Sequence, residues 1–255
     1  MEEKPQTQPE ANDSKEIYII IAVGVIIIAC ICCLLVVAGY ALYQDIPTNL
    51  FPQGSTNVNV ADTPVPDVQD NTFTESFNSN RNGWTEGIYE DEYGTIDYTI
   101  SGTYLWDVVA EQGVNQKSWA TDAPFVEDFT STVDATHVSG AENASYGIIF
   151  RVVDAENLYY FCISDVGYYY AGLLENGVWT TLIDWTETNT INVNSANTLK
   201  VVGNGDQFNF YVNGTEVDSL RDSTHSSGTA GLAIELYDAG DQSTFEFDNF
   251  TIESP

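Results

Sequence analysis

Basic residues are scarce in this sequence, and their scarcity limits the partners it can have. Lysine and arginine together number 7, aspartate and glutamate number 38, and the formal net charge is -31. A surface this acidic repels the phosphates of nucleic acids and the headgroups of anionic lipids. The composition therefore excludes nucleic acid as a partner and suits an extracellular, calcium-rich or salty environment. The hydrophobic content of 43% still provides for one large folded domain.

Cysteine and histidine are nearly absent from the carboxyl-terminal part. Beyond residue 43 the only cysteine is Cys162, so this part forms no internal disulfide and must fold by its core alone. His137 and His225 lie among Gly, Ser and Thr without the spacing of metal ligands, and we predict that both are surface residues. The counts leave a Ser-His-Asp triad open, but no Gly-x-Ser-x-Gly turn marks a nucleophilic serine.

One long apolar run lies near the amino terminus. Residues 17–43 contain no charged residue, and as a helix they would extend about 40 Å, more than the roughly 30 Å hydrocarbon core of a bilayer. Tyr18 at one end and Tyr40 and Tyr43 at the other fit the aromatic belts of the two membrane interfaces. The run therefore predicts a single-pass transmembrane helix that anchors the protein in a membrane.

Two processing events are alternatives to this anchor. Residues 27–30, IIAC, resemble the cleavage motif of a bacterial lipoprotein, which would leave Cys30 lipidated. The sequence stays apolar from there to residue 43, whereas a lipoprotein normally turns polar at once and a cleaved signal needs a shorter apolar stretch. We therefore favour an uncleaved span in which Cys30, Cys32 and Cys33 are small packing residues, with palmitoylation or an intermembrane disulfide as alternatives.

The segments on either side of the apolar run differ in charge. Residues 1–16 form a polar head that contains Lys4 and Lys15 and is predicted to be disordered, and the next basic residue is Arg81. By the positive-inside rule the head is cytoplasmic and the bulk of the chain is extracellular, at the surface of the cell membrane. Residues 44–71 are rich in Pro and Asp, which predicts an extended linker.

Residues 72–255 have the pattern of an all-β domain. Short runs rich in Tyr, Val, Ile, Phe and Thr alternate with turns of Gly, Asn and Asp, and we find no convincing amphipathic helix. Turns such as Asn176-Gly177 and Asn213-Gly214 supply residues that adopt positive φ. Roughly ten antiparallel strands in this length predict a sandwich of two β-sheets, preceded by the transmembrane helix and the linker.

Five segments of this domain carry a family resemblance. In chain order they are FTESFNSNRNGW, SYGIIFRVVDAENLYYFCIS, ENGVW, NTLKVVGNGDQFNFYVNGTEV and GTAGLAIELYDAGDQSTFEFDNFTI. In order and spacing they resemble the concanavalin A-like lectin/glucanase superfamily, in particular its laminin G-like and 3-keto-disaccharide hydrolase-like (glycoside hydrolase 16-like) domains. The resemblance implies a jelly-roll β-sandwich over nearly all of residues 72–255. Its motifs, an Asn-Gly hairpin and a closing Phe-Asp-Asn-Phe strand, identify a fold and not an activity.

Aromatic residues crowd residues 157–179, and strand alternation divides them between two faces. Tyr159 and Phe161 fall on one face and Tyr160 and Cys162 on the other, so about half of the rings pack between the sheets.

The other rings predict a carbohydrate site, unless they only cover a sheet. A sugar lays its C–H face on an aromatic ring while its hydroxyls bind amides and carboxylates. The prediction depends on parity, because if Tyr168 and Tyr170 faced the core, Tyr169 alone would face outward. The predicted ligand-binding residues are Tyr168, Tyr170, Glu175, Asn176, Trp179 and Trp185.

The catalytic motif of the glucanases in that superfamily is not matched. Those enzymes carry a Glu-x-Asp-x-x-Glu strand, but here Glu246-Phe247-Asp248 is followed by Thr251. Strand parity also predicts that Glu253 lies on the opposite face from Glu246. We therefore assign no catalytic residue. Residues 238–243, DAGDQS, offer two carboxylates to a calcium ion, although a plain hairpin turn explains the same sequence.

Three functions are open at this point. The favoured one is a membrane-anchored extracellular β-sandwich that binds glycans or acts in adhesion. The second is a structural subunit of the cell surface that binds other surface proteins. The third is a carbohydrate-active hydrolase, for example of the 3-keto-disaccharide type, that uses carboxylates outside a recognised motif. The sequence favours a binding protein over an enzyme.

Overall fold

The computed structural model describes residues 72–255, and their regular structure consists of strands β1 to β15. The predicted head, transmembrane helix and linker lie outside the described residues. Within 72–255, no helix has the length and apolar character that crossing a bilayer requires. The all-β prediction is confirmed. The strands outnumber the roughly ten expected, partly because residues 93–110 form a hairpin around Gly102, whose φ is 84°.

The larger sheet contains nine antiparallel strands. Its order is β13-β12-β11-β6-β15-β4-β3-β2, and β1 pairs with the carboxyl-terminal end of β15. Its strands are β1 (Thr72–Glu75), β2 (Gly87–Glu90), β3 (Gly94–Ile100), β4 (Tyr104–Ala110), β6 (Phe129–Gly140), β11 (Asn197–Asn204), β12 (Gln207–Val212), β13 (Thr215–Arg221) and β15 (Gln242–Glu253).

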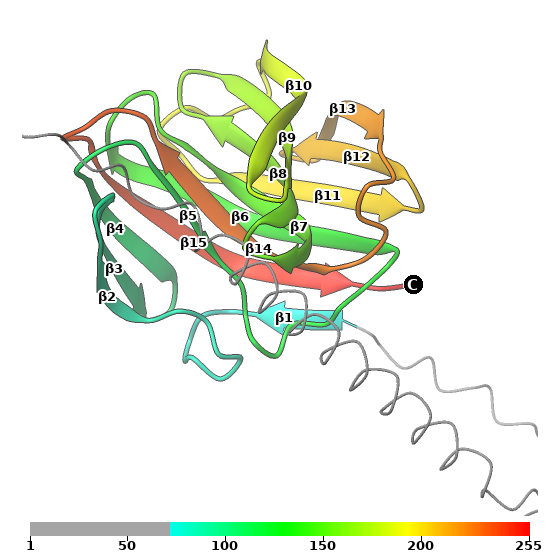
Figure 1. Ribbon diagram of the computed structural model, residues 1–255, viewed down its shortest axis with the longest axis horizontal. Helices are drawn as coiled ribbons and strands as arrows, with labels where there is room; N and C mark the ends of the chain where they lie inside the picture. Colours follow the sequence, from blue (N-terminus) through cyan, green and yellow to red (C-terminus); the bar gives the residue numbers. More distant parts are fainter. Residues whose placement is uncertain (1–71) are drawn as a thin grey trace, which may run out of the picture. The chain divides into compact units, whose positions relative to one another are not determined.

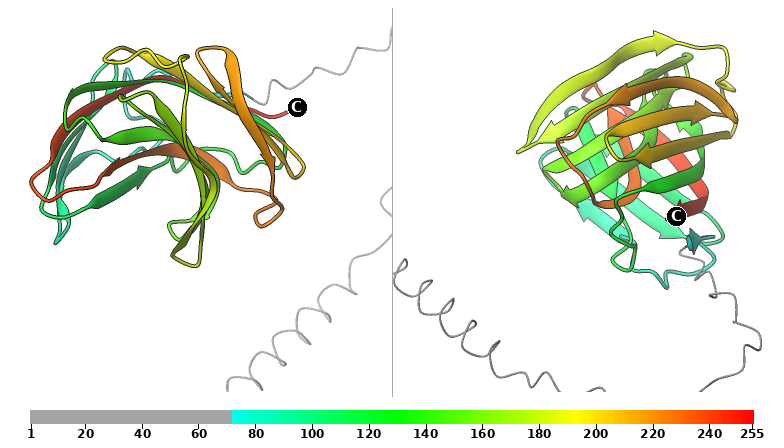
Figure 2. Two further views of the ribbon diagram at one scale, coloured as in Figure 1. Left: turned by 90° about the horizontal axis from the view of Figure 1, so that it is seen from above. Right: turned by 90° about the vertical axis from the view of Figure 1, so that its right-hand side faces the viewer.

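The smaller sheet contains six antiparallel strands in the order β10-β9-β8-β7-β14-β5. They are β5 (Val114–Ser118), β7 (Ser145–Asp154), β8 (Asn157–Ser164), β9 (Tyr168–Glu175), β10 (Val178–Glu187) and β14 (Thr229–Leu236). Figures 1 and 2 show the two sheets as curved layers, with β10 at the free edge of the smaller one. The described part is therefore a two-sheet β-sandwich of the jelly-roll kind.

The core follows from strand alternation. The main cluster of buried residues joins Trp106 and Phe245 of the nine-stranded sheet to Tyr159 and Phe161 of the six-stranded sheet. A second buried cluster, which includes Tyr160, lies on the opposite face of the six-stranded sheet. We call that face the outer face. The predicted division of the rings between two faces is thus confirmed.

One parity prediction is wrong, because β15 contains a bulge. Phe247 and Phe250 are both fully buried although they are three residues apart. Between them Asn249 adopts a φ of 52°, and the pairing of β15 with β6 shifts register. A bulge inserts one residue and so reverses the alternation beyond it. Glu246 and Glu253 consequently point away from the core on the same face of the nine-stranded sheet, not on opposite faces.

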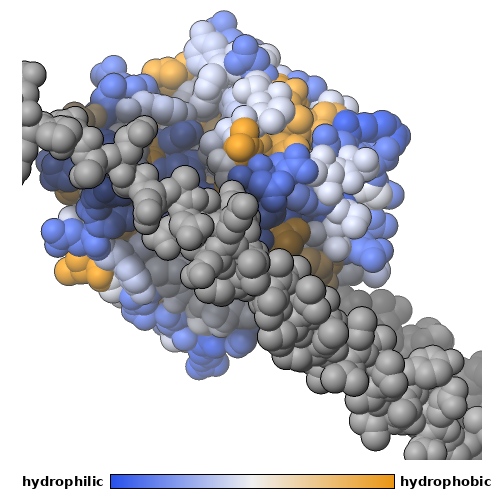
Figure 3. Space-filling view, in the orientation of Figure 1, coloured by the Kyte–Doolittle hydropathy of each residue, from blue (hydrophilic) through white to orange (hydrophobic). Residues whose placement is uncertain are grey.

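The exterior of the domain is largely hydrophilic. Figure 3, in the orientation of Figure 1, shows blue and white over most of the described surface and only small, separate hydrophobic patches. An acidic composition accounts for this, because carboxylates that lack basic partners stay in water. A concave site lined by exposed aromatic rings therefore differs in polarity from most of this surface.

Candidate ligand-binding site

The outer face of the six-stranded sheet is hollowed between its two edges. In the pairing register, Gly147 of β7 lies between Ala233 of β14 and Cys162 of β8, so small side chains occupy the middle of this face. Larger rings and polar side chains come from the strands on either side. The sheet therefore provides a floor with two walls.

Two adjoining hollows make up this groove. The polar hollow, of about 330 Å³, is lined by Tyr160, Tyr170, Trp179, Thr181, Asp184, Trp185, Glu235 and Tyr237. The apolar hollow, of about 310 Å³, is lined by Asn143, Ser164, Val166, Tyr168, Trp185 and Tyr237. The two hollows share Trp185 and Tyr237, and we call them together the groove. Their sizes lie at the lower end of the range for small-ligand sites.

Strands β9 and β10 provide the aromatic wall. Tyr169 packs in the main core, and Tyr170 packs against the cluster on the outer face, so the parity on which the predicted site depends is the favourable one. The Tyr170 ring lies over Gly172, where an added Cβ would come within 2.7 Å of the tyrosine hydroxyl. Its hydroxyl lies 3.3 Å from Thr181 Oγ1, which fixes the ring further.

Both tryptophans of the wall keep a large exposed area. Trp185 lies 5.2 Å from Tyr170 between ring centroids and is 38% exposed, and Trp179 is 39% exposed. Strand β10 shifts register twice against β9, between Thr181 and Ile183 and again before Thr186. These irregularities let Asp184 and Trp185, which are adjacent in sequence, both line the polar hollow.

The end of strand β14 and Tyr237, which follows it, provide the polar wall. Glu235 is partly buried, and this burial raises the pKa of its carboxyl group above the ordinary value. Lys117 of β5 pairs with Ala233, two residues from Glu235, and therefore lies on the same face. Burial lowers the pKa of its ammonium group. The Tyr237 hydroxyl donates to Ser145 Oγ at 3.1 Å. The groove thus sets hydrogen-bonding groups opposite aromatic rings.

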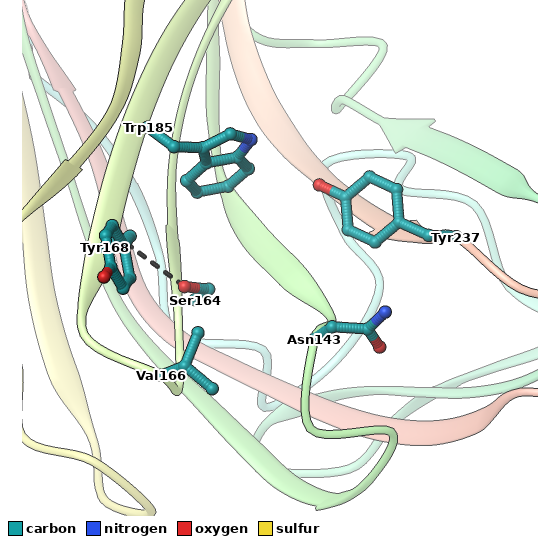
Figure 4. A pocket seen from close by; sticks show the side chains of 6 residues that line it. All are labelled: Asn143, Ser164, Val166, Tyr168, Trp185 and Tyr237. Atoms are coloured by element: carbon teal, nitrogen blue, oxygen red, sulfur yellow. Dashed lines mark hydrogen bonds between the residues drawn. The ribbon is translucent and has the colours of Figure 1, made fainter.

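Figure 4 shows how the apolar hollow is built. Trp185 and Tyr168 come from one side, Tyr237 and Asn143 from the other, and Val166 lies toward one end. The Ser164 hydroxyl is turned toward the carbonyl of Tyr168, 3.5 Å away. This hollow therefore presents mainly carbon.

The structure brings four of the six predicted site residues to the groove. Tyr170, Trp179 and Trp185 line the polar hollow, and Tyr168 lines the apolar hollow. Glu175 and Asn176 line neither hollow and are exposed in the β9–β10 turn. Asn176 has a φ of 51°, and its N–H donates to Asn157 Oδ1 at 3.0 Å, so its observed role is to shape the turn.

The sequence analysis missed the wall formed by β14. Glu235 and Tyr237 follow the predicted ring cluster by about fifty residues, and no local pattern indicates that β14 pairs with β7. The one available signal is alternation in AIELYD, which separates Glu235 from the buried Ile234 and Leu236. Alternation therefore predicts on which face of its strand Glu235 lies, but not which residues of other strands lie beside it.

Glu235 makes the stability of the domain depend on pH. Because burial raises its pKa above 4.5, the folded chain binds more protons than the unfolded chain between 4.5 and the raised value. The free energy of unfolding therefore falls as pH rises through that window. Glu235→Gln has no carboxyl group to ionise and so lacks this pH-dependent loss. We therefore expect the free energy of unfolding of Glu235→Gln, relative to that of wild type, to increase from pH 4 to pH 7 in urea titrations. Glu175→Gln is the matched exposed control, and parallel curves for wild type and Glu235→Gln would contradict the assignment.

His137 is buried, which corrects the prediction that it is a surface residue. It is 7% exposed, and its Nδ1–H donates to Asp165 Oδ2 at 2.8 Å. Its Nε2 lies 3.2 Å from the Ser243 hydroxyl oxygen, and Tyr146 donates to the other oxygen of Asp165 at 2.8 Å. His225 is half-buried and also differs from the prediction.

This constellation has the bonding order of a Ser-His-Asp triad, but its serine is enclosed. Ser243 is 4% exposed, and its Oγ already accepts the N–H of Ala141 at 3.0 Å. A nearby hollow of about 290 Å³ is lined by His137 and Asp165 but not by Ser243. His137 and Ser243 lie in the nine-stranded sheet, and Asp165 follows β8 in the other sheet. We therefore interpret the network as a tie between the two sheets.

Removal of the His137 ring is expected to loosen this tie. His137→Ala leaves the buried carboxylate of Asp165 with one fewer donor, and we expect the free energy of unfolding to fall by about 2–3 kcal/mol. Ser243→Ala, which removes one hydroxyl, should cost about 1 kcal/mol. Urea unfolding measures both. Labelling of Ser243 by a fluorophosphonate would contradict a purely structural role.

Metal binding finds little support within the described part of the chain. No group of three or more His, Cys, Asp and Glu residues among 72–255 is placed to hold a metal ion. In the segment proposed for calcium, the N–H of Asp238 donates to Asp241 Oδ2 at 3.2 Å, so one of the two carboxylates caps the turn. Glu246 and Glu253 line neither hollow of the groove.

Comparison with known proteins relates this domain to solved structures. No protein-family model matches the sequence, and no curated protein matches it. The carbohydrate binding module CBM66 from Bacillus subtilis is 27% identical with a TM-score of 0.51, and the match covers 68% of this chain and 96% of that one. A Bacillus licheniformis beta-glucanase is 12% identical with a TM-score of 0.50 and coverages of 73% and 99%. The second likeness shows the fold alone, and both support the jelly-roll sandwich that the sequence resemblance implied.

Proposed function

We propose that this protein is a membrane-anchored extracellular protein that binds a glycan in the groove of its β-sandwich. The observation that supports this most is the pairing of exposed rings with carboxylates across one concavity. Trp179 and Trp185 present flat apolar faces, and Asp184 and Glu235 present acceptors. Sugars need both, because each ring has an apolar C–H face and a rim of hydroxyls.

The fixed geometry of the groove favours binding. The rings of the aromatic wall stand on strands β9 and β10 and not on loops, and Tyr170 is held by Trp185, Gly172 and Thr181. Such preorganisation lowers the entropy lost when a ligand binds. The 27% identical carbohydrate binding module, nearly all of which matches this chain, agrees with the same proposal.

The location is part of the proposal and rests on the amino-terminal sequence. Residues 17–43 have the length and apolar character of a membrane span, and Lys4 and Lys15 precede it. In this arrangement the groove faces the outside of the cell, where glycans of the cell envelope and of other organisms are found.

Protease treatment of intact cells tests this topology. We expect added protease to remove the domain at residues 72–255 and to leave a fragment that carries the amino-terminal head, because the head is cytoplasmic. An epitope tag at each end of the chain shows whether the head and the domain are retained or removed. Protection of the carboxyl-terminal epitope until the cells are lysed would contradict the orientation, and an acylated mature chain that begins at Cys30 would contradict the uncleaved anchor.

A glycan array probed with the intact protein in mild detergent tests the function. Retention of a glycan without release of shorter sugars supports a binding protein. Release of shorter sugars would instead support the hydrolase alternative, and retention by no glycan would support the structural subunit. Surface protein partners are then the next ligands to screen.

A further inference from the structure

The two hollows of the groove differ in chemistry, and this difference bears on the ligand. The polar hollow contains Asp184 and Glu235, whereas the apolar hollow contains no charged residue. Carbon dominates the lining of the apolar hollow, with Trp185 38%, Tyr237 39% and Val166 55% exposed. One ligand that fills both hollows must therefore have a polar part and an apolar part.

Two polar side chains of the apolar hollow are already engaged. Ser164 Oγ is directed to the carbonyl of Tyr168, and the Tyr237 hydroxyl donates to Ser145. Among the described residues, the Asn143 amide, the Tyr168 hydroxyl and the Trp185 Nε1–H make no hydrogen bond, and Asn143 is exposed at the rim. The hollow therefore offers a ligand three free polar groups on a lining that is otherwise mainly carbon.

An unsubstituted sugar is a poor occupant of this hollow. Its hydroxyls would leave water and find few partners, and burial of an unpaired hydroxyl is unfavourable. An apolar substituent gains from the same burial, since it leaves water for contact with Trp185, Tyr168 and Val166. A substituent that joins a methyl group to an amide or ester also suits a single amide at the rim.

We propose that the groove binds acetylated glycans, with the acetyl methyl in the apolar hollow, the acetyl carbonyl at Asn143 and the hydroxyls of the chain in the polar hollow. The proposal rests on the proposed glycan-binding function and specifies its ligand class. N-acetyl and O-acetyl groups present the same methyl and carbonyl, so the shared chemistry is the acetyl group.

Paired glycans that differ only in acetylation test this ligand class. The intact protein in mild detergent is titrated with both members of each pair that the array retains, and alkali treatment, which removes O-acetyl but not N-acetyl groups, distinguishes the two sources. We expect the acetylated member to bind about ten-fold more tightly, the scale of one methyl group in an apolar pocket.

Val166→Ser locates the acetyl group, and Val153→Ser, which changes an equally exposed valine of β7 outside the groove, is its control. We expect Val166→Ser to reduce the acetyl preference several-fold, whereas Val153→Ser should leave the affinities for both members unchanged. Equal affinity for both members, or a preference that survives Val166→Ser, would overturn this ligand class and leave glycan binding intact. If no glycan of any kind is retained, the proposed function fails as well.

Discussion

Replacing Arg151 by alanine is expected to lower the free energy of unfolding by about 4 kcal/mol, the largest stability effect that we expect of a single side chain. Arg151 is 2% exposed and adopts a φ of 49° at an irregularity of β7. Its guanidinium donates to three loop carbonyls, those of His225 at 2.7 Å, Glu127 at 2.8 Å and Gly205 at 2.7 Å. Without the guanidinium, each of these partly buried carbonyls loses a charged donor at about 1–3 kcal/mol, and these losses overlap.

The guanidinium also fills space between rings. Its central carbon lies 5.1 Å from the centroid of Phe208 and 6.0 Å from that of Phe129. Arg151→Lys keeps the charge but replaces a planar fork by a point donor, so it should recover only part of the loss.

Arg221→Ala is the matched control for Arg151→Ala. Arg221 is 66% exposed and pairs with the half-exposed Asp206 at the surface, so its loss should cost less than about 1 kcal/mol. Urea unfolding of the intact chain can be followed by tryptophan fluorescence, because all five tryptophans fall within residues 72–255. Equal costs for the two arginines would contradict the interpretation of Arg151 as the residue that joins the three loops.

Replacing Trp185 by alanine is expected to weaken glycan binding by ten- to a hundred-fold or more, the range for a ring that anchors an interface. Trp185 is one of the two rings that both hollows share, so its loss opens each of them. Because it is 38% exposed and stands on an edge strand, the thermal midpoint should change by only a few degrees. Titration calorimetry with a glycan from the array measures the loss, and thermal unfolding measures the stability.

Tyr89→Ala is the control for Trp185→Ala. Tyr89 is 54% exposed on β2 of the other sheet, away from the groove, so its removal should leave affinity unchanged. If Trp185→Ala bound as tightly as Tyr89→Ala, the groove would not be the glycan site. If Trp185→Ala failed to fold, the Trp185 ring would belong to the core.

Local alternation predicted what a single strand can specify. The division of Tyr159 and Phe161 from Tyr160 and Cys162 is as expected, because successive residues of a regular strand point to opposite faces. Cys162 is fully buried on the second of these faces, and burial raises the pKa of its thiol. The same rule failed at Asn249, where a bulge reverses the alternation and no local residue pattern revealed it.

Long-range pairing accounts for what the sequence could not predict. Glu235 joins the groove because β14 pairs with β7, and His137 is buried because Asp165 and Ser243 come to it from 28 and 106 residues away. Neither neighbourhood has a local signature, so His137 resembled a surface residue of a polar strand. The rings of β9 and β10 were predicted because a short turn makes those strands neighbours.

Oxidative footprinting of the tryptophans tests the central claim that a glycan binds in the groove. Trp179 and Trp185 are 39% and 38% exposed, whereas Trp84 and Trp106 are 3% and 0% exposed. We expect the first two to be oxidised rapidly in the free protein and to be protected, as read by mass spectrometry of their peptides, when a glycan from the array saturates the protein. Unchanged oxidation of both Trp179 and Trp185 under saturating glycan would contradict the account.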